Sequence, residues 1–239
     1  MSKGNDRPVR KVFTTRAGGV SLPPYDSFNL GDHVGDTLAD VTSNRNRLAR
    51  VIGLESHNIV WMEQIHSVNV TVVTQPQTPA VEATDALVTT TRGLALAVLA
   101  ADCVPVLLSD TEAGVVAAVH AGRMGARNGI VRRTIETMVD LGATPRNVHA
   151  LLGPAASGRH YEVPAKMAAD VERHLPGALV KTNKGTSGLD LRRGLARQLL
   201  QLGVKAIDID PRCTIEDKQL FSYRREGKTG RHAGLVWLP

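Results

Sequence analysis

Three apolar runs in close succession constrain the fold of this chain most. They span residues 94–101, 104–109 and 114–119, and each is rich in Val, Leu or Ala. Runs of this length, bounded by polar or turn-forming residues, predict β-strands that are buried on both faces. We therefore expect the fold to be organised around a covered sheet.

Reactive residues stand where these runs end. Asp102 and Cys103 separate the first two runs, and His120 directly follows the third. Upstream, Gln64 and His66 follow another strand-like run at residues 58–62. Buried polar groups are unfavourable unless they have a partner or a task. These positions are therefore candidates for a functional site.

The rest of the chain indicates helices and strands by its spacing and capping residues. Helices are predicted over residues 36–52, 126–141, 164–175 and 190–202; strands over 11–15, 68–74, 84–88, 147–152 and 204–209; and a hairpin within 217–237. Aromatic residues make up only 3% of the chain, so the core must consist of aliphatic side chains. Such a core is typical of layered sheets covered by helices.

The length of 239 residues allows one large domain or two small ones. Residues 1–10 are predicted to be a flexible leader, and residues 11–239 a single catalytic domain, because no Pro-, Gly- or Ser-rich linker separates two cores. No apolar run reaches the roughly 18 residues that cross a bilayer. Two cysteines, Cys103 and Cys213, cannot form a disulfide framework, so we expect a cytoplasmic protein without membrane contact.

The formal charge of +6 raises the question of nucleic-acid binding. Lys and Arg are spread along the chain without a run of five, which favours a solvated basic surface instead. Arg16, Arg123 and Arg231 each lie near a glycine, where a guanidinium beside flexible backbone suits phosphate or carboxylate. A solvated arginine at a turn remains the alternative for each. No P-loop or dinucleotide-binding fingerprint occurs.

Two imidazoles and one thiolate, from His66, His120 and Cys103, suit zinc and leave a fourth position for water or substrate. Their separation in sequence does not distinguish this site from a buried core cysteine, or from a Cys103 nucleophile served by either histidine. Asp102 would orient a histidine, act as an acid or base, or pair with an arginine. We take Cys103, Asp102, His66 and His120 as candidate catalytic residues.

Six ordered motifs carry a family resemblance. They are FTTRAGGVS (13–21), FNLG (28–31), QIHS (64–67), TDALV (84–88), ADCVPV (101–106) and VHAG (119–122). With these motifs the chain resembles the laccase-domain family, also called YfiH-like, multicopper polyphenol oxidase, or purine nucleoside phosphorylase of the laccase-domain type. The likeness extends over nearly the whole chain, including residues 153–154 and 221–225.

The resemblance implies an α/β (α+β) fold, a single-domain layered sandwich of mixed β-sheets flanked by helices. It implies zinc, with copper as an alternative, at the residues matching His66, Cys103 and His120. It also implies phosphorolysis of adenosine, inosine, guanosine and S-methyl-5′-thioadenosine, with adenosine deaminase activity. Nucleoside and phosphate would be the partners of a monomer or homodimer. Substrate and phosphate contacts are expected from five residues: Arg16, Asn29, Gln64, Arg123 and Arg231.

One motif departs from the family pattern. Many relatives have His-Ala-Gly-Trp-Arg-Gly where this chain has His120, Ala121, Gly122, Arg123, Met124 and Gly125. The aromatic residue is absent and the arginine comes one position earlier, so we expect a different substrate range.

Three other functions compete with this interpretation. The family resemblance also allows a metal-dependent amidase that edits UDP-muramyl-amino-acid precursors of peptidoglycan. A copper-dependent polyphenol oxidase is less compatible, because three ligands cannot build the several copper centres of a laccase. A basic nucleic-acid-binding module would leave Cys103 inert.

Overall fold

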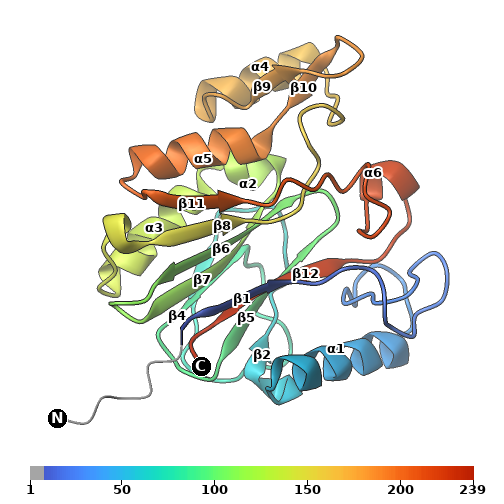
Figure 1. Ribbon diagram of the computed structural model, residues 1–239, viewed down its shortest axis with the longest axis vertical. Coiled ribbons are helices and arrows are strands. Elements are labelled where there is room, and N and C mark those ends of the chain that lie inside the picture. Colours follow the sequence, from blue (N-terminus) through green and yellow to red (C-terminus); the bar gives the residue numbers. More distant parts are fainter. Residues whose placement is uncertain (1–7) are drawn as a thin grey trace.

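The computed structural model describes residues 8–239, in which two large mixed sheets form the centre (Figure 1). The first sheet has the order β1 (Arg10–Phe13), β12 (His232–Trp237), β5 (Ala95–Ala100) and β2 (Ile59–Val60). The second has the order β11 (Ala206–Ile209), β8 (His149–Leu152), β6 (Val104–Asp110), β7 (Val115–Ala121), β4 (Ala86–Thr89) and β3 (Val70–Val72). A separate pair consists of β9 (Leu179–Lys181) and β10 (Ser187–Leu189).

Helices cover the outer faces of both sheets. The α-helices are α1 (Leu38–Ile52), α2 (Arg123–Asn128), α3 (Ile130–Asp140), α4 (Ala165–His174), α5 (Leu191–Gln201) and α6 (Tyr223–Glu226). Two short 3₁₀ turns, η1 (Ser56–Asn58) and η2 (Pro145–Asn147), precede β2 and β8. In Figure 1, α1 lies beyond the four-stranded sheet, and α2, α3 and α5 lie beyond the six-stranded sheet. This arrangement confirms the predicted layered α/β sandwich.

Side-chain alternation along the strands explains the layers, because successive residues of a strand point to opposite faces. In β5, Leu96 and Val98 belong to the core cluster between the two sheets. Their neighbours Ala97 and Leu99 belong to the cluster beneath α1, which contributes Leu48. The strand is therefore buried on both faces, as its continuous apolar sequence predicts.

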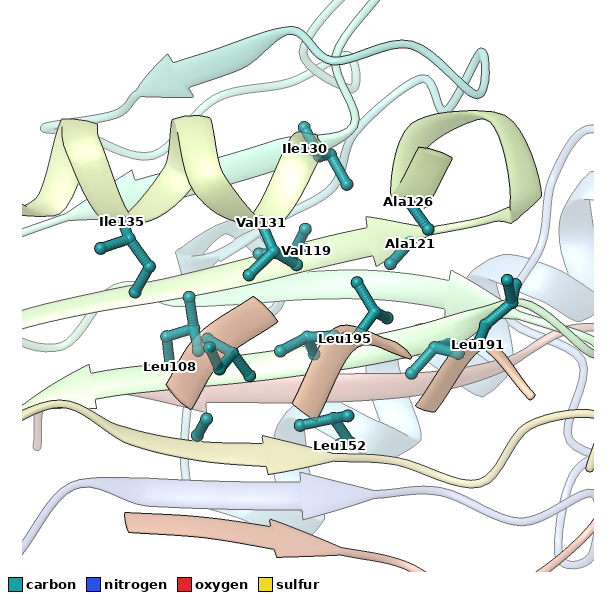
Figure 2. Close-up of a cluster of buried hydrophobic side chains, with 14 of the residues drawn as sticks. Leu108, Val119, Ala121, Ala126, Ile130, Val131, Ile135, Leu152, Leu191 and Leu195 are labelled. Atoms are coloured by element: carbon teal, nitrogen blue, oxygen red, sulfur yellow. The ribbon is translucent and has the colours of Figure 1, made fainter. Parts of the chain in front are cut away.

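The largest core cluster lies between the six-stranded sheet and the helices. Figure 2 shows Val131 and Ile135 of α3 and Leu195 of α5 pointing toward Leu108 of β6 and Val119 of β7. All five side chains are at most 3% exposed. Burying each of them stabilises the fold by about 1.5–3 kcal/mol relative to exposure.

Capping residues mark the ends of two helices, close to the ends of the predicted ranges 36–52 and 190–202. Thr37 caps α1 by accepting a hydrogen bond from the Asp40 amide, and Gly53 ends it with a φ of 75°. Asp190 caps α5 in the same way through the Arg193 amide. A glycine at the C-terminus adopts this left-handed backbone without the steric penalty of a Cβ.

Two sequence predictions are wrong. The helix predicted over 126–141 begins earlier, at Arg123, and divides into α2 and α3 because Gly129 takes a φ of 91°. The hairpin predicted within 217–237 does not form: β12 pairs instead with β1 and β5. The segment before it forms the short helix α6, capped by Ser222, whose hydroxyl also donates to the Asp102 carboxylate.

Three other expectations concern the whole chain. Most of the predicted leader, residues 1–7, lies outside the described residues, and β1 already begins at Arg10. Within residues 8–239, no helix combines the length and apolarity that crossing a bilayer requires. The single domain, cytoplasmic location and monomeric or dimeric state stay predictions.

Candidate metal centre and active site

Three segments far apart in the sequence meet at one edge of the two sheets. Cys103 lies in the turn between β5 and β6, His120 lies near the end of β7, and His66 follows β2 on a loop. Their potential ligand atoms all lie within 4.8 Å of one another. The centroids of the two imidazole rings are also 4.8 Å apart, with the rings at 67°. We call these three residues the cavity cluster.

The cavity cluster fits a metal ion. Zinc binds imidazole nitrogen at about 2.0 Å and thiolate sulfur at about 2.3 Å, so its ligands lie within a few ångströms of one another. Gly122 leaves space beside them: a Cβ there would lie 2.5 Å from His66 Nδ1 and 3.1 Å from Cys103 Sγ. Any larger residue at this position would displace two of the three side chains. The lack of space for a side chain therefore explains why the VHAG motif has a glycine at this position.

Asp85 connects two of these ligands, and the sequence interpretation did not identify it. Its Oδ1 accepts hydrogen bonds from His120 Nδ1 at 2.8 Å and from the His66 amide at 3.0 Å. Its Oδ2 accepts from the Ser67 amide and hydroxyl, both at 2.7 Å. Because a carboxylate can only accept, the His120 proton lies on Nδ1 and leaves Nε2 for a metal. The available signal was an aspartate immediately before the apolar residues 86–88, within the TDALV motif.

The charges of the cluster are strongly coupled. Burial alone would raise the pKa of Asp85, but hydrogen bonds from His120 and Ser67 lower it to about 2. Burial opposes protonation of His120, yet the negative charges of Cys103 and Asp85 raise its pKa to about 9. Burial and the neighbouring His120 lower the pKa of His66. A metal must displace the proton of His120, so its binding should weaken in acid.

Asp102 holds the surrounding segments rather than a histidine. Its Oδ1 accepts hydrogen bonds from the Thr214 and Ser222 hydroxyls at 2.6 and 2.7 Å, and its Oδ2 accepts from the Arg224 amide at 2.6 Å. Its φ of 104° is rare for a residue with a Cβ and is of order 1–3 kcal/mol unfavourable. The three hydrogen bonds keep it there. A direct catalytic role for Asp102 stays a prediction.

The cavity cluster opens into a cavity of about 320 Å³. Its lining residues are His33, Gln64, His66, Leu99, Ala100, Ala101, Asp102, Cys103, His120, Arg123, Tyr161, Leu191, Tyr223, Arg224 and Arg231. The structure thus brings Gln64, Arg123 and Arg231 to one cavity, and their contacts with substrate or phosphate stay predictions. Tyr161, Tyr223 and Arg224 were not identified from the sequence, because nothing local to them marks a site.

Arg16 and Asn29 do not line this cavity. Arg16 forms ion pairs with Asp26 at 3.3 Å and Glu226 at 2.7 Å. Asn29 is fully buried, and its Oδ1 accepts from the backbone amide of Arg231 at 2.9 Å. Asn29 therefore positions a cavity residue, and a substrate contact for either residue stays a prediction.

Gln64 lies on the wall with its amide already engaged. Its Nε2 donates to the Leu99 carbonyl at 2.8 Å, and its Oε1 accepts from the Leu99 amide at 2.7 Å. These bonds fix the loop that carries His66 to the end of β5. Gln64 acts in this geometry by positioning His66.

The arginines give the cavity its positive charge. Arg231 Nη1 donates to the carbonyls of Thr229 and Gly230, both at 3.0 Å, and Arg224 Nη1 donates to the Glu162 carbonyl at 3.0 Å. Arg123 begins α2, whereas its neighbour Met124 is 38% exposed and lies outside the lining.

No carboxylate within residues 8–239 forms an ion pair with any of these three arginines. Their charge is therefore available to an anion.

Comparison with known proteins identifies the family. Residues 10–239 match the family described as multi-copper polyphenol oxidoreductase laccase. A purine nucleoside phosphorylase of Corynebacterium glutamicum is 70% identical over 98% of this chain and 96% of its own length. A purine nucleoside phosphorylase of Mycobacterium tuberculosis (strain H37Rv) is 59% identical over 96% of this chain and 92% of its own.

A solved structure has the same fold. The crystal structure of the hypothetical protein YfiH of Bacillus licheniformis aligns with a TM-score of 0.91 and 32% identity, over 97% of this chain and 93% of that one. The predicted YfiH-like fold is confirmed. The chain therefore belongs to the YfiH family of laccase-like domains.

Proposed function

We propose that this protein is a metal-dependent purine nucleoside phosphorylase. The observation that carries the proposal is one cavity that combines the cavity cluster with three arginines unpaired with carboxylates. Two relatives with the names of purine nucleoside phosphorylases, at 70% and 59% identity, support the same activity. The proposed substrates are adenosine, inosine, guanosine and S-methyl-5′-thioadenosine, each with inorganic phosphate.

The arginines would bind phosphate. Arg123, Arg224 and Arg231 present guanidinium groups to one cavity, and guanidinium geometry matches phosphate oxygens through paired hydrogen bonds. Burial lowers the pKa of Arg231, but a guanidinium remains charged at neutral pH. Holding phosphate beside the nucleoside would remove much of the entropic barrier of a reaction between two molecules.

Two tyrosines would contact the nucleoside. Tyr161 and Tyr223 line the cavity beside the arginines. Arg224 lies over the Tyr161 ring at 5.1 Å and Arg231 over the Tyr223 ring at 6.0 Å, so a purine would stack on the ring face that the guanidinium leaves open. Burial raises the pKa of Tyr161, so its phenol keeps its proton at neutral pH and can donate a hydrogen bond to the base.

In the proposed reaction, a phosphate oxygen forms a bond to ribose C1′ while the bond from C1′ to the purine N9 breaks. The bonding electrons leave with the purine, which takes up a proton. The arginines hold the attacking phosphate, and the Tyr161 hydroxyl donates a hydrogen bond to the departing base. The products are the free purine and ribose 1-phosphate.

His66, Cys103 and His120 would hold the metal, which we propose to be zinc because one thiolate and two imidazoles form a common zinc donor set. When bound, the ion supplies a Lewis acid that stabilises negative charge on oxygen. Copper is the alternative metal, but with two histidines this cluster cannot build the several copper centres of an oxidase. Adenosine deamination, replacement of the C6 amino group by water's oxygen, is proposed as a companion activity of the same cavity.

Product chromatography of adenosine incubated with the purified protein tests this function. We expect adenine and ribose 1-phosphate only when phosphate is present, and inosine with ammonia from deamination. Cys103→Ala should abolish both, whereas His57→Ala, at an exposed position outside the cavity, should not change either. Adenine release independent of phosphate, or hydrolysis of a UDP-muramyl amide with no phosphorolysis, would refute the proposal.

A further inference from the structure

A second cluster of potential metal ligands lies outside the cavity lining, on segments next to it. It consists of His160, Cys213 and Glu216, whose ligand atoms all lie within 4.8 Å of one another. We call it the wall cluster. The proposed phosphorylase activity uses none of the three.

The distances match the edges of a tetrahedral zinc site. His160 Nδ1 lies 3.8 Å from Cys213 Sγ and 3.3 Å from Glu216 Oε2. Zinc bonds of about 2.0 Å to nitrogen, 2.3 Å to sulfur and 2.1 Å to oxygen, at tetrahedral angles, separate these atoms by about 3.5 and 3.3 Å. The two distances from His160 Nδ1 therefore lie within a few tenths of an ångström of those in a zinc site.

The same geometry argues against a catalytic relay. In a cysteine, histidine and carboxylate relay, the thiol and the carboxylate contact opposite nitrogens of the imidazole. Here Cys213 and Glu216 both approach Nδ1 of His160. Three electron-pair donors that converge on one point are typical of metal ligation.

Other polar groups contact the wall cluster. The Ser157 amide donates to Cys213 Sγ at 3.4 Å, and the Ser157 hydroxyl lies 3.3 Å from His160 Nδ1. The Asn183 side-chain nitrogen Nδ2 lies 3.4 Å from His160 Nε2 and helps to orient the ring, so that Nδ1 faces Cys213 and Glu216. Cys213 is buried, whereas the Glu216 side chain is 50% exposed and gives the ion access from solvent.

We propose that the wall cluster binds a zinc ion separate from that of the cavity cluster, with water as the fourth ligand. The ion would join two segments of the cavity wall, which already meet where Ala155 pairs with Cys213. One segment continues into Tyr161, which lines the cavity. The other continues into Thr214, which holds Asp102. Zinc at the wall cluster would therefore brace the cavity without contacting the substrate.

Metal content of the full-length protein tests this proposal. Metal-stripped protein is loaded with zinc, dialysed and measured by mass spectrometry. We expect about two zinc ions per chain in the wild type, about one in Cys103→Ser, about one in Cys213→Ser and none in the double variant. Two ions in Cys213→Ser, or no zinc in Cys103→Ser, would overturn the proposal. This experiment measures zinc content and not phosphorolysis. The zinc site at the wall cluster and the proposed phosphorylase function are therefore tested independently.

A second variant avoids substitution of the buried Cys213. It changes Glu216, whose half-exposed side chain can be replaced with less disturbance of the fold. Glu216→Ala in the Cys103→Ser background should lose its remaining zinc, and zinc should no longer raise its melting temperature. Glu55→Ala in the same background is the matched control at an exposed glutamate, and it should keep both. If the two variants bind zinc equally, Glu216 is not a ligand and the wall cluster is not a zinc site.

Discussion

Asp85 is the most informative position to perturb, because one carboxylate supports two of the three ligands of the cavity cluster. Asp85→Asn keeps the size of the side chain but replaces one acceptor oxygen with a donor. At Oδ1 the new NH₂ would face His120 and the His66 amide; at Oδ2 it would face the amides of Ile65 and Ser67. In either orientation at least one ligand loses its support.

The magnitude follows from the lost hydrogen bonds. Each hydrogen bond to a charged group contributes about 1.5–3 kcal/mol, and at least two are lost, so we expect the free energy of unfolding to fall by about 3–6 kcal/mol. Substituting a residue that orients a metal ligand lowers metal affinity by about 10- to 100-fold. We therefore expect both a less stable protein and weaker zinc binding.

Asp110→Asn is the matched control. Asp110 is also buried, and its two oxygens accept from the Ala113 and Thr144 amides at 3.0 and 2.8 Å. It lies at the far end of β6 from Cys103. This variant should lose about 1.5–3 kcal/mol of stability, for one hydrogen bond, and keep its zinc affinity. Denaturant unfolding and competition with a chromophoric chelator measure the two quantities. Equal zinc affinity in Asp85→Asn, Asp110→Asn and the wild type would refute the role of Asp85.

Three further predictions concern the cavity and the core. Gly122→Ala should weaken zinc binding at the cavity cluster, because its Cβ would fall 2.5 Å from His66 Nδ1; unchanged metal affinity would contradict this. Arg231→Gln should raise the KM for phosphate by about 10-fold or more, the loss of one charged hydrogen bond, and steady-state kinetics at varied phosphate decide it. His232 is fully buried without a hydrogen-bond partner among residues 8–239, and burial, together with the positive charges of Arg212 and Arg231, lowers its pKa to about 3. The unfolded chain takes up this proton below pH 6.5 and the folded chain does not, so stability is complete above that pH and falls toward pH 3. Between pH 7 and 4.5, His232→Leu should lose about 2–3 kcal/mol less stability than the wild type, as measured by denaturant unfolding.

The sequence predicts the parts of this structure that depend on local patterns. The buried strands β5, β6 and β7 follow from continuous apolar runs, and the ends of α1 follow from Thr37 and Gly53. The residues of the cavity cluster were also identifiable, because polar groups interrupted or ended those runs. Each of these signals lies within a few residues of the feature that it predicts.

Features that depend on distant contacts were not predicted. The segment before β12 forms α6 rather than a hairpin arm because Ser222 bonds to Asp102, 120 residues away in sequence. Asp85 bonds to His120, which lies 35 residues later in the sequence. Arg224 lines the same cavity as Cys103 and His120 although it lies far from both in the sequence. No local pattern encodes such distances, so the residues that support the site become visible only in the folded chain.

Anomalous diffraction at the zinc edge, from crystals of the zinc-loaded protein, tests the central claim most directly. We predict a peak within about 2.0–2.3 Å of ligand atoms from His66, Cys103 and His120, at the cavity that the three arginines line. Zinc-loaded crystals with no peak there, and with Cys103 Sγ bound to nothing, would contradict the assignment of this cluster as a metal centre.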